Sequence, residues 1–431
     1  MKLQSLLFPQ TGICTEEKMY FRRNGTIDFT WDKDYLNMFR DSSITFDTYF
    51  NGCSAEKWFK YTKIKKIRIF LHVKGQFRIT LMRKEKSLDG TMTKFLHEET
   101  FGEEGRDGVY SFPFDTESNS GMFCFGLLCL SSMGSLYDGW YDGEAAPEDV
   151  RKVRLALDIC TFKREVFVTK NVREMYDCFL NNPDSELYNG LEIFISDNAK
   201  TLNADDILLC DKVHLFRNKN TGGAGGFTRG MIEIMKCREE RGITHVLVMD
   251  DDIIINPDSV FRTFMILSLL KDEYQDAFVG GAMLRLDKQF IQTEAGARWN
   301  KGYLISHKSG LNLLDVEACL YNEFEEKTEV KAFATFTAHE SSGSVNVTFI
   351  FNATDLVGTT VVAFESLSNE YGVVAIHEDI NDEDQTSYLP HIGTTATDPN
   401  GAKDVKADEV TQITDVVEYT NLQVGVFHNV G

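Results

Sequence analysis

Three consecutive aspartates, Asp250 to Asp252, directly follow the apolar run Val246 to Met249. Carboxylates crowded at the end of a buried strand are costly unless a cation or ordered hydrogen-bond donors compensate their charge. Clustered carboxylates favour hard ions, so the stretch predicts a Mg²⁺ or Mn²⁺ site or a site beside a phosphate. The alternative is a solvated loop with a helix cap. Because Asp258 or Ser259 can supply that cap alone, we favour the ligand-binding interpretation.

A glycine-rich segment, NKNTGGAGGFTRGM at residues 218–231, places four glycines before an expected helix. Backbone amides can approach a ligand closely there, and the start of a helix attracts an anion. The spacing matches neither GxxxxGK[ST] nor GxGxxG, and a tight strand-to-helix turn explains it at least as well. Arg164 adds a cation at the end of another expected strand. With the aspartates, these features describe a nucleotide-diphosphate site.

The elements that position these residues alternate between strand and helix from residue 151. We expect strands at 153–160, 191–197, 212–218 and 245–249, and helices at 171–180, 226–240 and 258–273. This alternation indicates an α/β layer with a mainly parallel sheet. Each polar cluster then falls at the carboxyl end of a strand, where open α/β sheets bind ligands.

Residues 1–150 show the two-residue period of an antiparallel β domain. Apolar residues alternate over 67–73 and again over 77–81, and Lys74-Gly75-Gln76 is expected to turn between them. The acidic, glycine-containing stretch 99–108 is expected to be a loop.

Composition excludes several classes of protein. The net charge of −21 argues against nucleic-acid binding, which needs an excess of Lys and Arg on one face. The nine cysteines show no CxxC and no zinc spacing, which suits reduced thiols. The N-terminus does not resemble a secretion signal, and no apolar run approaches the ~18 residues of a membrane span. We expect a cytoplasmic protein, with the inner face of the membrane as a place of peripheral association.

The composition changes abruptly near Lys331. Residues 332–431 hold 15 acidic residues, two lysines and no arginine, a net charge of −13. Their apolar pattern returns to a period of two, in short Thr-rich segments bounded by turn residues. The chain therefore consists of two unlike parts.

Five segments carry a resemblance to a known family: ICTFKRE (159–165), SDNAK (196–200), NTGGAGGFTRGM (220–231), VLVMDDDIIINPDSV (246–260) and VGGAMLRLD (279–287). In order and spacing they resemble the GT-A galactofuranosyltransferases that build cell-surface glycans. FDTYFNGCSAEKWFKYT (46–62) resembles part of the β-sandwich that precedes the catalytic domain in that family. The resemblance implies an N-terminal β-sandwich at 1–150 and a GT-A-like (Rossmann-like) nucleotide-sugar domain at 151–330.

The resemblance also implies roles for individual residues. The donor-nucleotide positions are Thr161, Arg164, Asn198, Asn220, Asp250 and Asp251. Asp250 and Asp252 form the D-x-D pair for Mn²⁺ or Mg²⁺, with Asp252 as the more direct ligand. Trp299 would lie near the acceptor or the sugar, although a plain core tryptophan fits equally well. The implied partners are a UDP-sugar donor and a glycan or lipid-linked glycan acceptor.

The catalytic residues of the family have no counterpart here. Its general base comes from a DD pair downstream of the GGAML segment, and a later histidine completes its metal site. After CLYNEFEEKTE (319–329) this chain continues VKAFATFTAHESSG instead. We therefore identify no general base and expect impaired transfer.

The remaining residues resemble the VaFE repeats of Gram-positive surface adhesins, in the segments 341–367, 373–386 and 392–398. Such repeats are Ig-like β modules locked by an ester bond between a Thr hydroxyl and a Gln side chain. Glu365, His377 and Gln385 match the ester-bond pattern. The alternative interpretation is that they are ordinary polar residues on the surface of an acidic β-hairpin. The module at 332–431 is incomplete, because the one strand of the Thr-bearing type has Val416 in the Thr position.

Two functions therefore compete. The first is a glycosyltransferase with an impaired active site, and the alternative is a non-enzymatic fragment of a surface adhesin. Because these belong in different compartments, we hypothesise a chimera from recombination or assembly error. A continuous product amplified from one genome across the codons for 322–337 would contradict assembly error.

Overall fold

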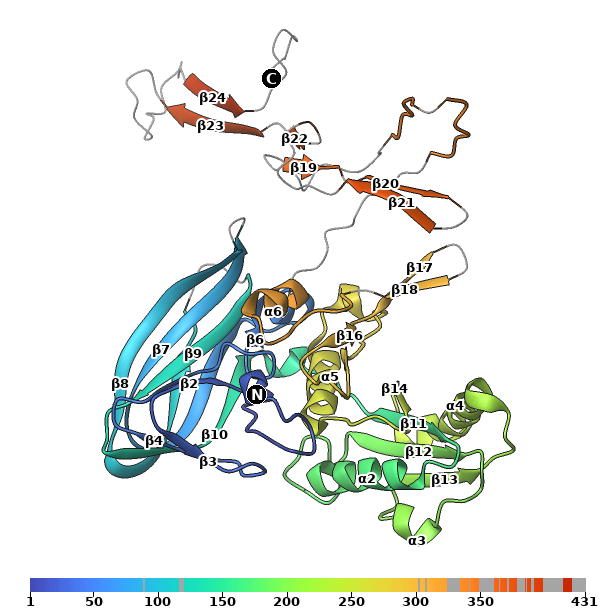
Figure 1. The fold of residues 1–431 in the computed structure, drawn as a ribbon. Helices are drawn as coiled ribbons and strands as arrows, with labels where there is room; N and C mark the ends of the chain where they lie inside the picture. Colours follow the sequence, from blue (N-terminus) through green and yellow to red (C-terminus); the bar gives the residue numbers. More distant parts are fainter. Residues whose placement is uncertain are drawn as a thin grey trace, which may run out of the picture. The chain divides into compact units, whose positions relative to one another are not determined.

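The computed structural model describes residues 1–87, 90–115, 120–300, 303–306, 308–323, 334–340, 342–348, 360–363, 365–369, 372–377, 384, 386–388, 391–397 and 414–420. The chain divides into two compact units, residues 1–325 and 326–431 (Figure 1). Among the described residues, no helix is long and apolar enough to cross a membrane.

The first part of unit 1 is a β domain of ten strands: β1 (Lys2–Ser5), β2 (Arg22–Asn24), β3 (Ile27–Phe29), β4 (Leu36–Phe39), β5 (Ser43–Thr45), β6 (Cys53–Ser54), β7 (Lys66–Ser87), β8 (Gly90–Pro113), β9 (Met122–Cys129) and β10 (Met133–Glu144). Helix α1 (Ala55–Tyr61) follows β6. The strand order is β2-β5-β9-β7-β10-β4-β3, all antiparallel, and β8 pairs with β7. Alternate residues of the strands are fully buried in an aromatic-rich core.

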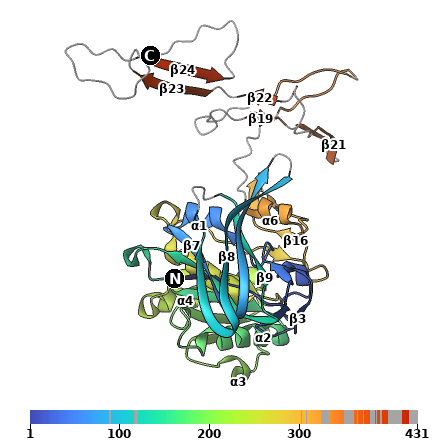
Figure 2. The same ribbon diagram turned by 90° about the vertical axis from the view of Figure 1, so that its left-hand side faces the viewer.

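Strand β7 corrects two expectations. It continues through Lys74-Gly75-Gln76 without turning, because Gly75 adopts a φ of +114° and a shift in the register with β8 accommodates it there. Its first half pairs with β10 and its second half with β9. The expected loop at 99–108 is also wrong, since these residues belong to β8, which runs beside β7 over its whole length (Figure 2). The acidic residues are tolerated because most of them are exposed.

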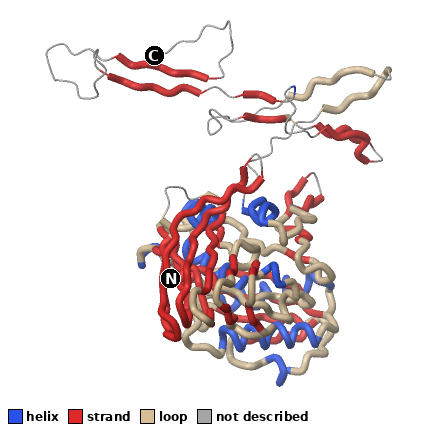
Figure 3. Tube along the Cα trace, turned by 60° about the vertical axis from the view of Figure 1, so that its left-hand side comes forward, coloured by secondary structure: helices blue, strands red, loops and turns tan. Residues whose placement is uncertain are grey.

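The second part of unit 1 contains a four-stranded parallel sheet of order β13-β12-β11-β14. Its strands are β11 (Leu155–Thr161), β12 (Leu191–Asp197), β13 (Val213–Arg217) and β14 (His245–Asp250). Helices α2 (Glu165–Met175), α3 (Ala204–Ile207), α4 (Gly222–Arg241) and α5 (Pro257–Leu269) connect or follow them (Figure 3). Strands β12 and β13 extend the sheet on one side of β11, and β14 lies on the other. The strand order therefore reverses between β11 and β14, where such sheets bind ligands.

Two helix starts differ from the sequence-based expectation. Helix α4 begins at Gly222, so the glycines form its first turns and do not precede it. Helix α5 is capped by Asn256, whose Oδ1 accepts from the backbone N–H of Asp258, with Pro257 in the first position. The expected cap at Asp258 or Ser259 is wrong. Asp258 is buried and accepts a hydrogen bond from the Ser5 N–H at 3.1 Å, which ties α5 to β1.

Buried charge fixes α4 on the sheet. Glu192 of β12 is fully buried, and three basic groups surround its carboxylate: Arg154 at 2.7 Å, His214 at 2.9 Å and Arg241, from the end of α4, at 3.0 Å. Helix α4 also packs on β11, but it leaves the edge strand β14 uncovered on that face. Val246 and Val248 of β14 are consequently 41% and 48% exposed.

Unit 1 ends with the hairpins β15 (Met283–Leu284) with β16 (Gln292–Glu294) and β17 (Ala297–Asn300) with β18 (Tyr303–Ser306), and with helix α6 (Val316–Glu323). Unit 2 contains three antiparallel pairs: β19 (Thr360–Val362) with β22 (Thr386–Tyr388), β20 (Glu365–Asn369) with β21 (Gly372–His377), and β23 (His391–Thr397) with β24 (Thr414–Thr420).

Candidate functional site

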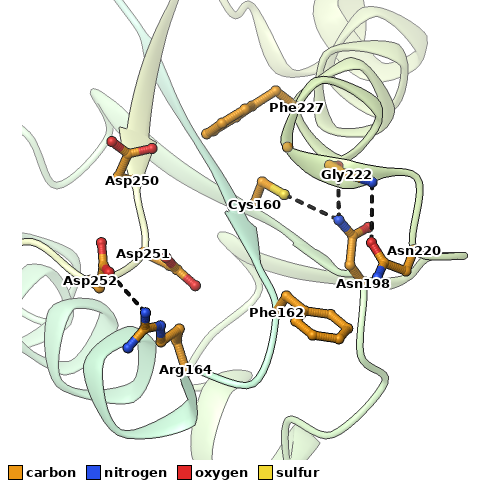
Figure 4. A pocket seen from close by; sticks show the side chains of 11 residues that line it. Cys160, Phe162, Arg164, Asn198, Asn220, Gly222, Phe227, Asp250, Asp251 and Asp252 are labelled. Carbon is orange, nitrogen blue, oxygen red and sulfur yellow. Dashed lines mark hydrogen bonds and ion pairs between the residues drawn. The ribbon is translucent and has the colours of Figure 1, made fainter.

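A pocket of about 380 Å³ opens where β11, β14 and the start of α4 meet (Figure 4). It is lined by Cys160, Phe162, Arg164, Asn198, Asn220, Gly222, Gly223, Phe227, Asp250, Asp251 and Asp252. Acidic and amide side chains lie on different walls, and Arg164 lies beside the acidic one. The pocket therefore brings together groups separated by nearly a hundred residues of chain.

The acidic wall is exposed to solvent. The Asp252 Oδ2 and the Arg164 Nη2 lie 3.5 Å apart, and these side chains are 44% and 52% exposed. An ion pair this exposed contributes little, so Arg164 can exchange the carboxylate for another anion. The loop after β14 is fixed from α2, where the buried Asn171 donates its amide N–H to the Ile253 carbonyl at 3.0 Å.

The opposite wall is a chain of amides at the start of α4. The Asn198 Nδ2 donates to the Gly222 carbonyl at 3.1 Å, and the Asn218 Nδ2 donates to the Asn198 Oδ1 at 2.9 Å. The Asn220 Oδ1 accepts from the Gly222 N–H at 3.1 Å. Gly222 has a φ of +75°, a conformation that favours glycine. These contacts hold the first turn of α4 against the end of β12, and the start of a helix favours an anion.

Five of the expected donor-nucleotide residues line this pocket, and the expected metal ligand Asp252 lies there as well: Arg164, Asn198, Asn220, Asp250, Asp251 and Asp252. Thr161 is not among the lining residues. Strand alternation directs its side chain away from the face that carries Cys160. The side chain is 2% exposed, and its hydroxyl has no hydrogen-bond partner. Trp299 belongs to β17, and its side chain lies outside the described part of the structure.

Sequence reasoning did not single out Cys160, Phe162 or Phe227. Phe162 is 46% exposed at the mouth of the pocket. The sequence offered one signal for Cys160 and Phe162. They flank Thr161, and because side chains alternate along a strand, either Thr161 or its two neighbours must face the site. Burial raises the pKa of the Cys160 thiol, and its sulfur accepts a hydrogen bond from the Asn198 Nδ2 at 3.4 Å.

The carboxylate oxygens of the acidic wall fit a hard cation that takes some of its coordinating oxygens from a bound ligand. Within the described residues, no group of three or more His, Cys, Asp or Glu side chains is placed to enclose a metal. Mg²⁺ commonly binds one or two carboxylates plus substrate phosphates and water. Asp250 and Asp252 both line the pocket and are the carboxylates that would contribute to such a site.

A buried carboxyl group lies beneath the pocket. Asp158 is on β11 two residues before Cys160, is 0% exposed, and neither of its oxygens has a hydrogen-bond partner. Gly230 of α4 packs so closely on it that a Cβ there would lie 1.8 Å from the Asp158 Oδ1. Burial raises the pKa of Asp158 to about 7. The carboxyl group is thus substantially protonated at neutral pH.

In unit 2, Glu365 and His377 face each other across β20 and β21, with the His377 Nδ1 3.6 Å from the Glu365 Oε2. Gln385, the third expected member of the ester-bond pattern, lies outside the described residues. Val416 on β24 pairs with Thr395 on β23.

Two family models match the chain. The model described as galactofuranosyltransferase 2 N-terminal matches residues 3–109, and the T-Q ester bond containing domain matches residues 315–389 and 390–431. The galactofuranosyltransferase GlfT2 of Mycobacterium tuberculosis is 26% identical over 263 residues, 59% of this chain and 39% of that protein. The GlfT2 of Mycolicibacterium smegmatis is 24% identical over 258 residues, 58% of this chain and 37% of that protein.

The chain therefore spans less than half the length of these relatives. Among solved structures, the CBM22-1 xylan-binding domain of Paenibacillus barcinonensis Xyn10C is 9% identical, with a TM-score of 0.21 over 33% of this chain and 93% of that chain. A TM-score this low establishes no shared fold. The N-terminal part of the chain resembles galactofuranosyltransferases, and the C-terminal part resembles T-Q ester bond domains.

Proposed function

We propose that unit 1 binds a UDP-sugar together with Mn²⁺ or Mg²⁺ and is a glycosyltransferase of the galactofuranosyltransferase type. The observation that supports this most directly is the pocket at the sheet's switch point, which has an amide wall and an acidic wall with Arg164 beside it. The kinship with glycosyltransferases supplies the class of reaction. The acceptor is a glycan or a lipid-linked glycan, reached from the cytoplasm.

Each group has a defined task in this proposal. Asn198 and Asn220 hold the nucleoside, and Arg164 with the N–H groups of the first turn of α4 holds the diphosphate. Asp250 and Asp252 hold the cation, which neutralises the departing diphosphate when bound. Asp251, the third carboxylate of the pocket lining, is assigned to the donor nucleotide, so no lining carboxylate is left to deprotonate an acceptor hydroxyl. We therefore propose that binding is retained and transfer is slow.

The first test is calorimetry of the purified chain with UDP, with and without Mn²⁺. We expect Mn²⁺ to tighten binding at least about tenfold, and Asp252→Ala to abolish that gain, because the cation loses a carboxylate while the amide wall remains. Asp287→Ala is the matched control, since Asp287 is an exposed aspartate paired with Arg285. UDP binding that is unaffected by Mn²⁺ and by Asp252→Ala would contradict the proposal.

Gly226→Ala should weaken UDP binding about tenfold or more. A Cβ at Gly226 would lie 2.0 Å from the Cys160 Sγ and 3.1 Å from the Asn198 Nδ2, so α4 must move away from the pocket floor. Gly223→Ala is the control, because Gly223 lines the same pocket and a Cβ there meets nothing within 4 Å. Equal affinities of the two variants for UDP would contradict the assigned role of the helix start.

A second candidate function is favoured by the pairing of Glu365 with His377. We propose it as a cross-linked β domain of the adhesin type, in which a Thr hydroxyl attacks the Gln385 carboxamide, an ester forms and ammonia leaves. The intact mass of the purified chain tests this. A mass lower by one ammonia, restored by Gln385→Ala, supports the cross-link, and the unmodified mass contradicts it.

A further inference from the structure

The outer face of the β domain carries aromatic side chains where water-facing polar residues are expected. On β7, Ile69 and Leu71 point inward and are fully buried, so Phe70 and His72 point outward. On β10, Tyr141 is fully buried, and its neighbour Trp140 points outward. We call Phe70, His72, Tyr137 and Trp140 the aromatic surface.

The aromatic surface is built from ring pairs that cover each other. Phe70 and Trp140 are stacked, with centroids 5.0 Å apart and planes at 4°. His72 and Tyr137 have centroids 5.1 Å apart and planes at 54°. All four side chains are partly buried, yet neither Phe70, Tyr137 nor Trp140 packs against a hydrophobic core cluster. The described core therefore gives no structural reason for these rings.

Small polar residues lie on both sides of the stacked pair in the sheet register. Ser5 of β1 lies directly opposite Trp140, and Ser111 of β8 lies directly opposite Phe70. Across four neighbouring strands the row reads Ser, Trp, Phe, Ser, so no large side chain in register covers the outer ring faces. Both serines are at least partly exposed, which makes their hydroxyls available to a ligand.

Hydrogen-bonding groups border the rings along the strands. The His72 Nε2 lies 2.7 Å from the Asp107 Oδ1, and Asp138 pairs with His72 across β7 and β10. Arg68 lies two residues from Phe70 on the other side, opposite Asp142. Because residues two apart on a strand are about 7 Å apart, the polar groups flank the stacked rings at the spacing of a short oligomer.

This chemistry suits a neutral polyhydroxylated chain. The apolar C–H faces of a sugar pack on aromatic rings, while carboxylates, imidazole, guanidinium and serine hydroxyls bond its hydroxyl groups. The aspartates beside the rings oppose nucleic acid and anionic lipid, which require a cationic surface. We propose that the aromatic surface is a glycan-binding site, separate from the pocket at β11 and β14.

The position of the surface suggests what the bound glycan is for. Ser5, beside Trp140, donates its N–H to Asp258, which lies six residues after Asp252. Even a fully extended chain of six residues spans only about 20 Å, so β1 meets the α/β part close to the acidic wall. The surface can hold a glycan acceptor at a distance from its reacting end. That role rests on the proposed function, whereas glycan binding itself does not.

The test is titration of the full chain with two probes, a galactofuranose hexasaccharide and cellohexaose, by calorimetry. We expect at least one probe to bind with a dissociation constant below about 1 mM, and Trp140→Ala and Phe70→Ala each to weaken it at least about tenfold. Phe95→Ala is the matched control, because Phe95 is a 74% exposed aromatic residue on β8 outside the aromatic surface. It should bind the probe like the unchanged chain.

Two results would overturn the proposal: neither probe binds, or Trp140→Ala and Phe95→Ala bind equally well. UDP titration of Trp140→Ala shows whether the variant is folded. If it has lost both ligands, the conservative variant Trp140→Phe decides, since restored glycan binding supports the proposal and continued loss contradicts it. Glycan binding without any UDP binding would remove the proposed donor function and leave the glycan site standing.

Discussion

Glu192→Ala is expected to lower the free energy of unfolding of unit 1 by about 3–5 kcal/mol. The three basic groups around the buried carboxylate would lose their common partner, and the 0% exposure of Glu192 means that water cannot replace it without opening the sheet. The end of α4 would be released first, since Arg241 fixes it. Denaturant unfolding followed by helical circular dichroism measures the change.

Glu103→Ala is the control for this prediction. Glu103 also pairs with an arginine, Arg106 at 3.0 Å, but these side chains are 69% and 68% exposed. An exposed pair contributes at most about 1 kcal/mol. If Glu192→Ala cost no more than Glu103→Ala, the buried ion cluster would not be what holds α4 on the sheet.

Asp158→Asn is expected to stabilise the protein at neutral pH and above, and to leave it nearly unchanged only below about pH 4. The pKa of Asp158 is about 7 in the folded chain and 3.8 as its ordinary value, so the folded state binds the proton more tightly. The contribution of this group to stability is full below about pH 4 and is lost as the pH rises to about 7. Three pKa units correspond to at most about 4 kcal/mol.

Thermal unfolding between pH 5 and pH 8 measures this effect. The unchanged chain should lose stability as the pH rises from 5 to about 7, and the Asp158→Asn chain should not. This part of the shift is two pKa units, which corresponds to at most about 3 kcal/mol. Asp276→Asn serves as control because Asp276 is exposed. Identical pH profiles for the unchanged chain and Asp158→Asn would show that the carboxyl group finds water or a partner in solution.

The sequence predicted the parallel strands well because their signals are local. The run at 191–197 forms β12 as expected, since a short continuous apolar segment between turn residues has few alternatives. The convergence of Arg164, Asn198 and the aspartates also followed, because parallel strands end at one edge of a sheet. Their assignment to a nucleotide and a cation stays a prediction.

What failed depended on contacts between distant residues. Gly75 carries a turn signal, but pairing with β8, β9 and β10 on both sides of it keeps the strand continuous. Asp258 is a good cap by type, yet the N–H of Ser5 recruits its carboxylate and Asn256 takes the cap. The aromatic surface was invisible for the same reason, since Phe70 and Trp140 are seventy residues apart in sequence.

The exposed edge of β14 bears on how the protein behaves in a crowded solution. Among the residues that the structure describes, β14 pairs on one side only and carries exposed valines, so another chain can add a strand to it. Val246 and Val248 lie on the same strand as Asp250. Aggregation that begins on this strand would therefore block the pocket as well as lower the solubility. The charge of the aspartates that end β14 opposes such pairing, because it repels a second acidic strand end. A cation that neutralised these carboxylates would weaken this repulsion and favour precipitation.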